Sequence, residues 1–506
     1  MTPDDIGLYP RDESNAALVS NVRPQAWVNP EPRRKHDLVV LGAGTAGLVT
    51  VAGAAALGAR VAIVERGLMG GDCLNVGCVP SKSIIRSSRA WADARASVGY
   101  GVRGDGKADA DFAAVMARMR RVRAKISAHD AAARFRDMGV DVYFGEGRFE
   151  APDFVVVGDR RLKFRRAVIA TGARPAVPAI PGLAEAGFLT NETVFNLTER
   201  PRRLAVFGAG PLGCELAQAM ARLGSEVTII ERGTQLLPRE DADAAAIVAE
   251  AFRRDGVDVR FGAAVGKVSV SPDGKVLHCS RGGREEAIAV DEILVGAGRA
   301  PNVEGLNLEA VGVEFDTRTG VHVDDMLRTT NRRIFAAGDV CLEHKFTHAA
   351  DASARIVVRN ALFGGRKKLS SLVIPWCTYT DPEIAHVGMY EKQAQERGLT
   401  VETFTRRFDD VDRPVIDGEE EGLVKIHATP KGEIVGATVV ARRAGEMISE
   451  ITLAIAKGVT LAEISSLVHP YPTASEAIRQ AADAFNRTRL TPGVKWLLKG
   501  IMAVRR

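Results

Sequence analysis

VVLGAGTAGLVTVAGAAALGARVAIVERG, residues 39–67, recurs in altered form as AVFGAGPLGCELAQAMARLGSEVTIIERG, residues 205–233. The offset is 166 positions throughout, and Gly58, Val61, Arg66 and Gly67 each meet an identical residue in the second copy. Each copy runs from an apolar strand through GxGxxG and an Ala-rich helix to a second apolar strand that ends in Glu. This doubled context predicts two dinucleotide-binding βαβ units, whereas a single GxGxxG would be weak.

The glycines and the terminal glutamate of each copy have separate predicted roles. The first glycine permits the tight turn, the second lets the backbone approach a pyrophosphate, and the third packs the helix on the strand. The carboxylate is placed to accept hydrogen bonds from a ribose 2′-hydroxyl, and it would repel a 2′-phosphate, which favours NADH over NADPH in the second copy. The alternative is a pair of Gly-rich turns in unspecialised sheets. The residues concerned are Gly42, Gly44, Gly47 and Glu65 in the first copy, and Gly208, Gly210, Gly213 and Glu231 in the second.

The repetition extends beyond these units and sets the expected domains. GVDVYFGEG at 139–147 echoes GVDVRFGAA at 256–264, but the first copy carries 49 more residues before its echo than the second. We expect an α/β protein with two Rossmann-like dinucleotide-binding domains and a C-terminal α+β domain. The expected segments are a flexible arm at 1–36, the first nucleotide domain at 37–186, the second at 187–310, a segment returning to the first at 311–369, a C-terminal domain at 370–490 and a basic amphipathic tail at 491–506.

The composition excludes several classes of protein. The chain has 506 residues and a net charge of +5, which is too diffuse to indicate nucleic-acid binding. The N-terminus has acidic residues and prolines where a signal peptide needs a basic start and an apolar run, so we expect a cytoplasmic protein. Six cysteines are few, and in a reducing compartment a close pair is more often redox-active or metal-binding than structural.

That close pair lies within the 49 extra residues, in GGDCLNVGCVPSK at 70–82. Pro80 suits a helix start, so Cys78 is expected just before a helix N-terminus, where the partial positive charge favours a thiolate. A zinc or iron-sulfur site would need further clustered ligands, and none lies nearby in the sequence, so we predict no metal site. We expect Cys73 and Cys78 to form a redox pair. The alternatives are a metal site and two thiols that do not interact.

The chain resembles the class I pyridine nucleotide-disulfide oxidoreductases, which include dihydrolipoamide dehydrogenase, glutathione reductase and mercuric reductase. The resemblance covers roughly residues 36–490 and rests on GAGTAG, GGDCLNVGCVPSK, ATGARP, GAGPLG, GAGRAPN, AAGD and PTASE in the family's order. It implies a homodimer with FAD in the first copy and NAD(P)H in the second. Hydride would pass from nicotinamide to flavin, and the flavin would reduce the Cys73–Cys78 disulfide. Cys78 would face the flavin as the charge-transfer thiolate, and Cys73 would attack the acceptor.

The same resemblance assigns further residues. Lys82 and Glu215 match a lysine and glutamate that pair beside the flavin's reactive nitrogen; for either one alone, a solvated helix face is the alternative. Asp339 matches the carboxylate that holds the ribityl chain, although a plain turn is the alternative. The remaining motif residues assigned to cofactor binding are Gly71, Asp72, Thr171, Gly172, Gly298 and Gly338.

The sequence departs from the family at the C-terminal acid-base position. Disulfide reductases have a histidine immediately before the Pro-Thr of PTxSE, steered by the motif's glutamate, here Glu476, whereas this chain reads HPYPTASE with Tyr471 there. A phenol with a pKa of about 10 cannot replace imidazole as a base without a large shift. His469 lies two residues earlier and is either an alternative base or a satisfied structural histidine.

This departure leaves the electron acceptor open. Mercuric reductases have tyrosine at that position, but they also carry a vicinal cysteine pair near the C-terminus, and here no cysteine follows Cys377. The leading expectation is a small-molecule or protein disulfide or thiol acceptor. The alternatives are Hg(II), for which only Cys73 and Cys78 would offer thiolates, and electron transfer to a quinone or protein by a membrane-docked carrier.

The last residues form a basic amphipathic pattern. TPGVKWLLKGIMAVRR places apolar residues at helical spacing between lysines and arginines, and Pro492 suits a helix start. About 14 residues are too few to span a bilayer, which needs about 20. The tail is expected either to lie on the inner face of a membrane, as a peripheral contact, or to dock on its own dimer.

Overall fold

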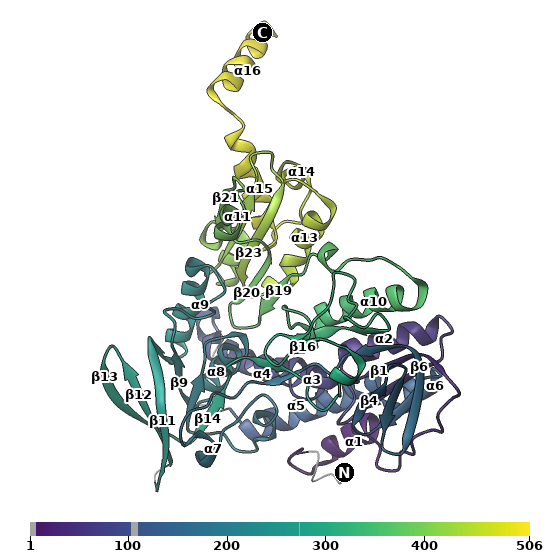
Figure 1. Cartoon of the computed structure of the whole chain (residues 1–506). Coiled ribbons are helices and arrows are strands. Elements are labelled where there is room, and N and C mark those ends of the chain that lie inside the picture. Colours follow the sequence, from purple (N-terminus) through teal and green to yellow (C-terminus); the bar gives the residue numbers. More distant parts are fainter. Residues whose placement is uncertain (1–6, 103–109, 273, 506) are drawn as a thin grey trace. The chain divides into compact units, whose positions relative to one another are not determined.

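The computed structural model describes residues 7–102, 110–272 and 274–505 (Figure 1). The chain divides into two compact units. Unit 1 comprises residues 1–232 and 257–372, and unit 2 comprises residues 233–256 and 373–506. Each unit is described by itself below.

The first nucleotide module of unit 1 is built on a sheet with the order β3-β2-β1-β6-β5-β4, and β18 pairs with β6. The β3, β2, β1, β6 and β18 pairings are parallel, and β4 and β5 extend the sheet as antiparallel strands. β1 and β2 are almost entirely buried, which explains their continuous apolar runs. The strands are β1 (His36–Leu41), β2 (Val61–Glu65), β3 (Asp141–Phe144), β4 (Gly147–Ala151), β5 (Phe154–Val157), β6 (Arg160–Ile169) and β18 (Ile334–Ala336).

The second module repeats this order with β10-β9-β8-β14, and all of its pairings are parallel. Its elements in unit 1 are β8 (Arg203–Phe207), α8 (Pro211–Arg222), β9 (Glu226–Glu231), β10 (Asp258–Phe261) and β14 (Glu292–Val295). α8 corresponds to α2 (Thr45–Ala56) of the first module. The predicted α/β class with two dinucleotide-binding folds is confirmed.

The cysteine pair lies in a helical insertion between β2 and β3, at the place that the extra residues of the first copy indicate. The helices are α3 (Gly71–Asn75), α4 (Cys78–Ala96), α5 (Phe112–Ser127) and α6 (Ala132–Asp137). The remaining elements of unit 1 are β7 (Ala173–Pro175), α7 (Leu183–Ala186), β11 (Ala263–Ser271), β12 (Gly274–Arg281), β13 (Arg284–Val290), β15 (Arg299–Pro301), β16 (Phe315–Asp316), β17 (Gly320–Val321) and α10 (Thr347–Phe363).

Unit 2 is an antiparallel five-stranded sheet with the order β19-β20-β23-β22-β21. A core cluster joins its strands to α13 and α15. Its elements are α9 (Ala242–Arg254), β19 (Trp376–Thr378), β20 (Glu383–Gly388), α11 (Glu391–Glu396), β21 (Glu402–Arg407), α12 (Asp412–Asp417), β22 (Leu423–Ala428), β23 (Ile434–Ala441), α13 (Ala444–Lys457), α14 (Leu461–Ser466), α15 (Glu476–Thr488) and α16 (Pro492–Val504).

The second module's connection between β9 and β10 belongs to unit 2. Residues 233–256 contain α9, and the preceding Glu240 is buried there. Its carboxylate accepts hydrogen bonds from Trp376 Nε1 at 2.9 Å and from the Tyr390 hydroxyl at 2.7 Å. The sequence pattern predicts this segment in the second nucleotide domain. The structure instead groups it with the C-terminal sheet.

The N-terminal segment differs from the expected flexible arm at 1–36. Residues 13–22 form α1 (Glu13–Val22), whose Leu18 and Val22 are fully buried. Trp27 Nε1 donates to the Val142 carbonyl at 3.1 Å. The prediction of a flexible arm is therefore wrong for this stretch, because α1 buries apolar residues. The prolines on both sides of α1 keep the helix too short for its apolar periodicity to be recognised in the sequence. Residues 1–6 lie outside the described part.

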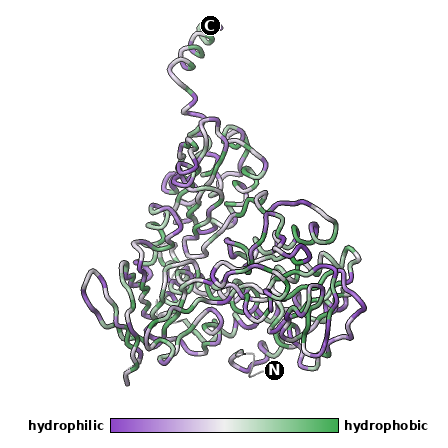
Figure 2. Tube along the Cα trace, viewed as in Figure 1, coloured by the Kyte–Doolittle hydropathy of each residue, from purple (hydrophilic) through white to green (hydrophobic). Residues whose placement is uncertain are grey.

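The tail forms the predicted helix, α16, with Pro492 at its first position and the Thr491 side chain capping it. None of its described side chains is buried. Figure 2 shows apolar and polar residues alternating along it. Among the described residues, no helix is both long enough and apolar enough to cross a membrane.

Candidate active site

The two cysteines of the pair occupy consecutive short elements. Cys73 lies on α3, and Cys78 is the first residue of α4, one position further into the helix than the sequence indicates. Both are free thiols, and each has the largest effect on the pKa of the other. The residue before α4 is Gly77. A larger residue would not fit there, because an added Cβ would lie 2.8 Å from the Asp72 carbonyl oxygen. This close turn brings the two sulfurs together.

The surroundings of the pair separate the two thiols in acidity. The hydrogen bond from Cys73 is the main effect that lowers the pKa of Cys78 to about 6, against the opposing effect of burial. The Thr347 hydroxyl, 3.4 Å from Cys78 Sγ, and the charge of Lys82 lower that pKa further, whereas Glu215 raises it. The same hydrogen bond and burial raise the pKa of Cys73. The pKa of Cys78 therefore lies below that of Cys73.

Lys82 and Glu215 form the ion pair that the sequence motifs suggest. Lys82 lies on α4, one turn beyond Cys78, and its Nζ donates to Glu215 Oε2 on α8 at 2.7 Å. The Glu215 side chain is only 4% exposed. A buried carboxylate is costly without such a partner. The pair thus links the redox helix to the first helix of the second nucleotide module.

The first GxGxxG turn forms one side of a dinucleotide cradle. A Cβ at Gly42 would lie 2.4 Å from the Ala170 carbonyl oxygen, and a Cβ at Gly47 would lie 1.9 Å from the Gly42 carbonyl oxygen. A Cβ at Gly71 would lie 2.6 Å from Gly44 Cα, so the redox segment and the turn meet through backbone. These positions therefore require glycine for close packing.

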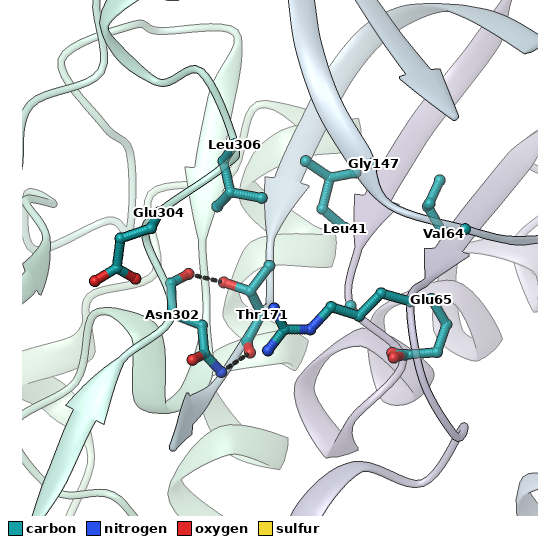
Figure 3. A pocket seen from close by; sticks show the side chains of 11 residues that line it. Leu41, Val64, Glu65, Gly147, Thr171, Asn302, Glu304 and Leu306 are labelled. Atoms are coloured by element: carbon teal, nitrogen blue, oxygen red, sulfur yellow. Dashed lines mark hydrogen bonds between the residues drawn. The ribbon is translucent and has the colours of Figure 1, made fainter. Parts of the chain in front are cut away.

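Beside this turn lies a cavity of about 70 Å³, shown in Figure 3. Leu41, Val64 and Leu306 line it with apolar side chains, and Glu65 adds a carboxylate. Glu65 accepts hydrogen bonds from the backbone of Ala43 and Gly67, each at 2.6 Å, and burial raises its pKa. Apolar walls, a ribose-facing carboxylate and the N-terminus of α2 fit the adenosine half of FAD.

The opposite wall of this cavity is held by a reciprocal pair. Thr171 Oγ1 donates to the Asn302 carbonyl at 2.7 Å, and Asn302 Nδ2 donates to the Thr171 carbonyl at 2.9 Å (Figure 3). Gly172 follows with a φ of +68°. These bonds fix the ATGARP segment to the GAGRAPN segment, where β7 pairs with β15.

Two aspartates expected at the cofactor meet at one arginine. Arg299 forms ion pairs with Asp72 and, at 3.5 Å from its Nε, with Asp339. Burial raises the pKa of Asp339, and the Arg299 charge opposes this shift. Beyond this ion pair with Asp339, Arg299 Nε is buried and makes no hydrogen bond within the described part of the chain. A buried polar atom without a hydrogen bond fits a site that a bound cofactor would complete. Gly338, beside Asp339, has a φ of +76° and packs on Ala46 of α2.

The second turn repeats this geometry. A Cβ at Gly208 would lie 2.9 Å from the Gly296 carbonyl oxygen, and one at Gly213 would lie 2.3 Å from the Gly208 carbonyl oxygen. A Cβ at Gly210 would meet no described atom within 4 Å, which leaves room for a pyrophosphate. The backbone N–H of Ala209 donates to Glu231 Oε2 at 2.8 Å, matching Ala43 and Glu65. Gly298 lies before β15 with a φ of +110°.

The C-terminal candidates belong to unit 2 and have separate partners there. The exposed Tyr471 donates its hydroxyl to Asp412 Oδ2 at 2.7 Å, and this bond raises the pKa of Tyr471. His469 Nε2 lies 2.8 Å from Glu450 Oε1, and Glu476 pairs with Arg479 at 2.8 Å. Among these described groups, His469 and Glu476 therefore do not form a dyad, and the structure favours a structural role for His469.

Comparisons with known proteins decide the family. The family described as pyridine nucleotide-disulphide oxidoreductase matches residues 36–355, and its dimerisation domain matches residues 374–482. The chain belongs to this family. The expected resemblance is thus confirmed, the oxidoreductase is an enzyme of an FAD-dependent family that uses pyridine nucleotides, and the dimerisation domain supports a homodimer.

Proteins similar to this chain carry the names of more than one enzyme. The chain is 34% identical to a mercuric reductase of Bacillus cereus over 96% of this chain and 76% of that protein. It is 33% identical to a dihydrolipoyl dehydrogenase of Thermus scotoductus over 90% of this chain and 98% of that protein. Among solved structures, the HOCl-induced flavoprotein disulfide reductase RclA of Escherichia coli has a TM-score of 0.79 at 28% identity, covering 88% of this chain and 99% of that one.

The sequence reasoning missed three residues of the site. Thr347 contacts Cys78 from 269 positions away, and Arg299 reaches Asp72 from 227 positions away. Asn302 fixes Thr171. Arg299 and Asn302 stand in the quoted motif GAGRAPN, so the motif offered a signal for both. Thr347 stands just before the Ala-rich stretch and had no such signal.

Proposed function

We propose that this oxidoreductase oxidises NADH and passes two electrons through Cys73 and Cys78 to a disulfide or metal acceptor. The observation that supports this most directly is the hydrogen-bonded thiol pair with the pKa of Cys78 lowered to about 6. A bound flavin would supply the hydride acceptor between nicotinamide and the disulfide. The reaction balances in two steps. NADH, a proton and the Cys73–Cys78 disulfide give NAD⁺ and the dithiol. The dithiol then reduces an acceptor disulfide to two thiols and is itself oxidised back to the Cys73–Cys78 disulfide.

The chain's own residues divide this work. Cys78 holds the negative charge of the reduced pair, and Lys82 stabilises that charge. Cys73 keeps its proton at neutral pH because its pKa is raised, so it needs a base before it can attack an acceptor. Tyr471 is poorly suited to be that base, because its hydroxyl donates to Asp412. This supports an acceptor that does not require histidine-assisted dithiol chemistry, and Hg(II) bound by the two sulfurs is the second candidate.

The acceptor can be identified by turnover. The FAD-loaded enzyme is mixed with NADH and, in turn, with lipoamide, glutathione disulfide, thiol-bound Hg(II) and a quinone. We expect oxidation of NADH with a disulfide or Hg(II), and loss of this activity in Cys73→Ser. Turnover with the quinone that survives Cys73→Ser, together with no turnover of the other acceptors, would instead identify an electron carrier that bypasses the pair.

Preference for NADH rests on Glu231. Its carboxylate, which accepts a hydrogen bond from the Ala209 N–H, would repel a 2′-phosphate. For two partly screened charges this repulsion costs about 1.4 kcal/mol, which corresponds to a tenfold difference in kcat/KM. We expect the wild type to favour NADH over NADPH in kcat/KM by at least about tenfold, and Glu231→Gln to lose most of that preference. Glu65→Gln changes the matching residue of the other copy and should leave the ratio unchanged. A wild type that prefers NADPH would refute the assignment.

Peripheral membrane contact through α16 is the remaining part of the proposal. Trp496 is 78% exposed and Val504 90% exposed, and the tail beyond residue 488 carries basic but no acidic side chains. Exposed apolar and basic residues on one helix suit an anionic lipid surface.

Truncation after Leu490 tests this contact by co-sedimentation with vesicles that contain phosphatidylserine. We expect the truncated enzyme to lose binding, and Lys495→Glu with Lys499→Glu to weaken it by at least about tenfold, since each basic residue contributes about 1 kcal/mol. Neutral phosphatidylcholine vesicles are the control. Equal binding by the full-length and truncated enzymes would exclude the tail as the contact.

A further inference from the structure

The N-terminal helix α1 lies before the segment that matches the oxidoreductase family, yet it is bonded to the loop that carries the cysteines. α1 packs beside α5 within unit 1 (Figure 1). Leu18 and Val22 are fully buried in this packing. Burial of these apolar side chains stabilises the packing of α1 on unit 1. α1 is therefore a fixed part of unit 1.

One chain of hydrogen bonds runs from α1 to the residue midway between the cysteines. Asn15 Oδ1 on α1 accepts from Arg123 Nη2 on α5 at 2.7 Å. Arg123 Nη1 donates to the Asn75 carbonyl at 2.7 Å. Asn75 is the last residue of α3, between Cys73 and Cys78. The three groups are almost entirely buried, with Arg123 at 0% exposure.

Arg123 has no ordinary ion-pair partner to explain its burial. Within the described part of the chain, no carboxylate forms an ion pair with it, and burial lowers its pKa to about 10. Its guanidinium donates hydrogen bonds to two neutral oxygens, the side-chain oxygen of Asn15 and the carbonyl of Asn75. A buried guanidinium is costly, so this arrangement depends on both oxygens being held in place.

Asn15 is itself fixed by the turn that begins α1. Its backbone N–H donates to Asp12 Oδ1 at 2.8 Å, and its Nδ2 donates to the Pro10 carbonyl at 2.7 Å. Asp12 also pairs with Arg120 of α5. With Nδ2 engaged by Pro10, only Oδ1 of the side chain is left to face Arg123.

A second attachment holds the other end of the same loop. Arg23, just after α1, donates from Nη1 to the Arg66 carbonyl at 2.9 Å and to the Gly67 carbonyl at 2.6 Å. The Met69 N–H donates to the Val22 carbonyl at 3.2 Å. The N-terminal segment therefore binds the chain both immediately after Glu65 and between the two cysteines.

We propose that residues 10–23 are a positioning element for the redox loop, in which Asn15 and Arg123 hold the Asn75 carbonyl so that the Cys73 thiol reaches the Cys78 sulfur. Asn15 and Arg123 are positioning residues, since neither touches a sulfur atom. The groups that face Cys78 directly are Cys73, Thr347, Lys82 and Glu215. Asn15 acts on this set only through the backbone of the loop.

The inference rests on the proposed redox role of the pair, but it is tested without an acceptor. The rate of Cys78 alkylation by iodoacetamide is measured against pH in the reduced holoenzyme, with the modified peptide identified by mass spectrometry. For Asn15→Leu we expect the rate at pH 6.5 to fall about fivefold and the rate at pH 9 to stay near that of the wild type, because the hydrogen bond from Cys73 weakens.

Two variants separate positioning from general stability. Asn21→Leu removes a bond of the same kind between the same helices, since Asn21 Nδ2 donates to Ser127 Oγ at 2.9 Å, but this bond does not lead to the loop. Asn15→Asp keeps an acceptor for Arg123. Both should retain the wild-type alkylation profile.

The proposal is overturned if Asn15→Leu keeps the wild-type profile or if Asn21→Leu shifts it equally. If Asn15→Leu does not fold, Asn15→Ala removes the acceptor without adding volume and is read in the same way. Failure of every acceptor in turnover, with the alkylation shift present, would refute the proposed function and leave the positioning role intact.

Discussion

Cys78→Ser is expected to reduce NADH-dependent turnover of a disulfide or Hg(II) acceptor by at least about 10³-fold, while flavin reduction by NADH persists. Serine cannot take part in the disulfide, and the group whose pKa is lowered to about 6 is lost. Steady-state turnover gives the loss of activity. Stopped-flow spectra of the reduced enzyme should also lack the long-wavelength thiolate-to-flavin absorbance that we expect in the wild type.

The pH dependence of that absorbance distinguishes the two sulfurs. A thiolate is present above its pKa, so the wild-type band should fade as the pH falls through about 6. Cys73→Ala removes the hydrogen bond that contributes most to lowering the pKa of Cys78. The band should therefore survive in Cys73→Ala at high pH and fade at a higher pH than in the wild type. A band that persists in Cys78→Ser would show that the thiolate is assigned to the wrong cysteine.

Lys82→Met and Glu215→Gln are expected to shift the pKa of Cys78 in opposite directions. The Lys82 charge lowers that pKa and the Glu215 charge raises it. Lys82→Met should therefore raise it and reduce the thiolate present at pH 7, whereas Glu215→Gln should lower it. Lys82→Met also leaves Glu215, 4% exposed, without its cation, which should destabilise the enzyme by about 2 kcal/mol after allowance for the partial exposure of Lys82.

The pH profile of the thiolate absorbance measures the first effect, and urea denaturation measures the second. Lys82→Arg keeps the charge and serves as the matched control. The double variant should return the pKa of Cys78 towards the wild-type value, because the two opposing charges are removed together. Shifts of the same sign in the two single variants would contradict the electrostatic assignment.

Several elements follow from local sequence alone. Both predicted βαβ units are present, with β1 paired to β2 in the first and β8 paired to β9 in the second. α16 also begins at Pro492, where the sequence places a helix start. These predictions succeed because glycine positions, apolar runs and helix caps act over a few residues.

Other features could not be read in this way. The sequence did not reveal α1 because it is a short helix among prolines. Its stability comes from packing on α5, which begins at Phe112, 90 positions after α1 ends at Val22. Residues 233–256 follow a nucleotide-binding pattern in sequence but group with the C-terminal sheet, because Glu240 and α9 bury their side chains there.

The sequence by itself determined the doubled nucleotide-binding units, the redox pair and the absence of a histidine at position 471. Only the tertiary structure decided which groups surround the two sulfurs and in which direction they shift each pKa. Thr347, Lys82 and Glu215 reach Cys78 from three different helices, and Asn15 and Arg123 reach the loop from two more. The reason is physical: a cysteine pKa depends on charges and donors within a few ångströms, and the folded chain brings these together across separations that no local pattern records.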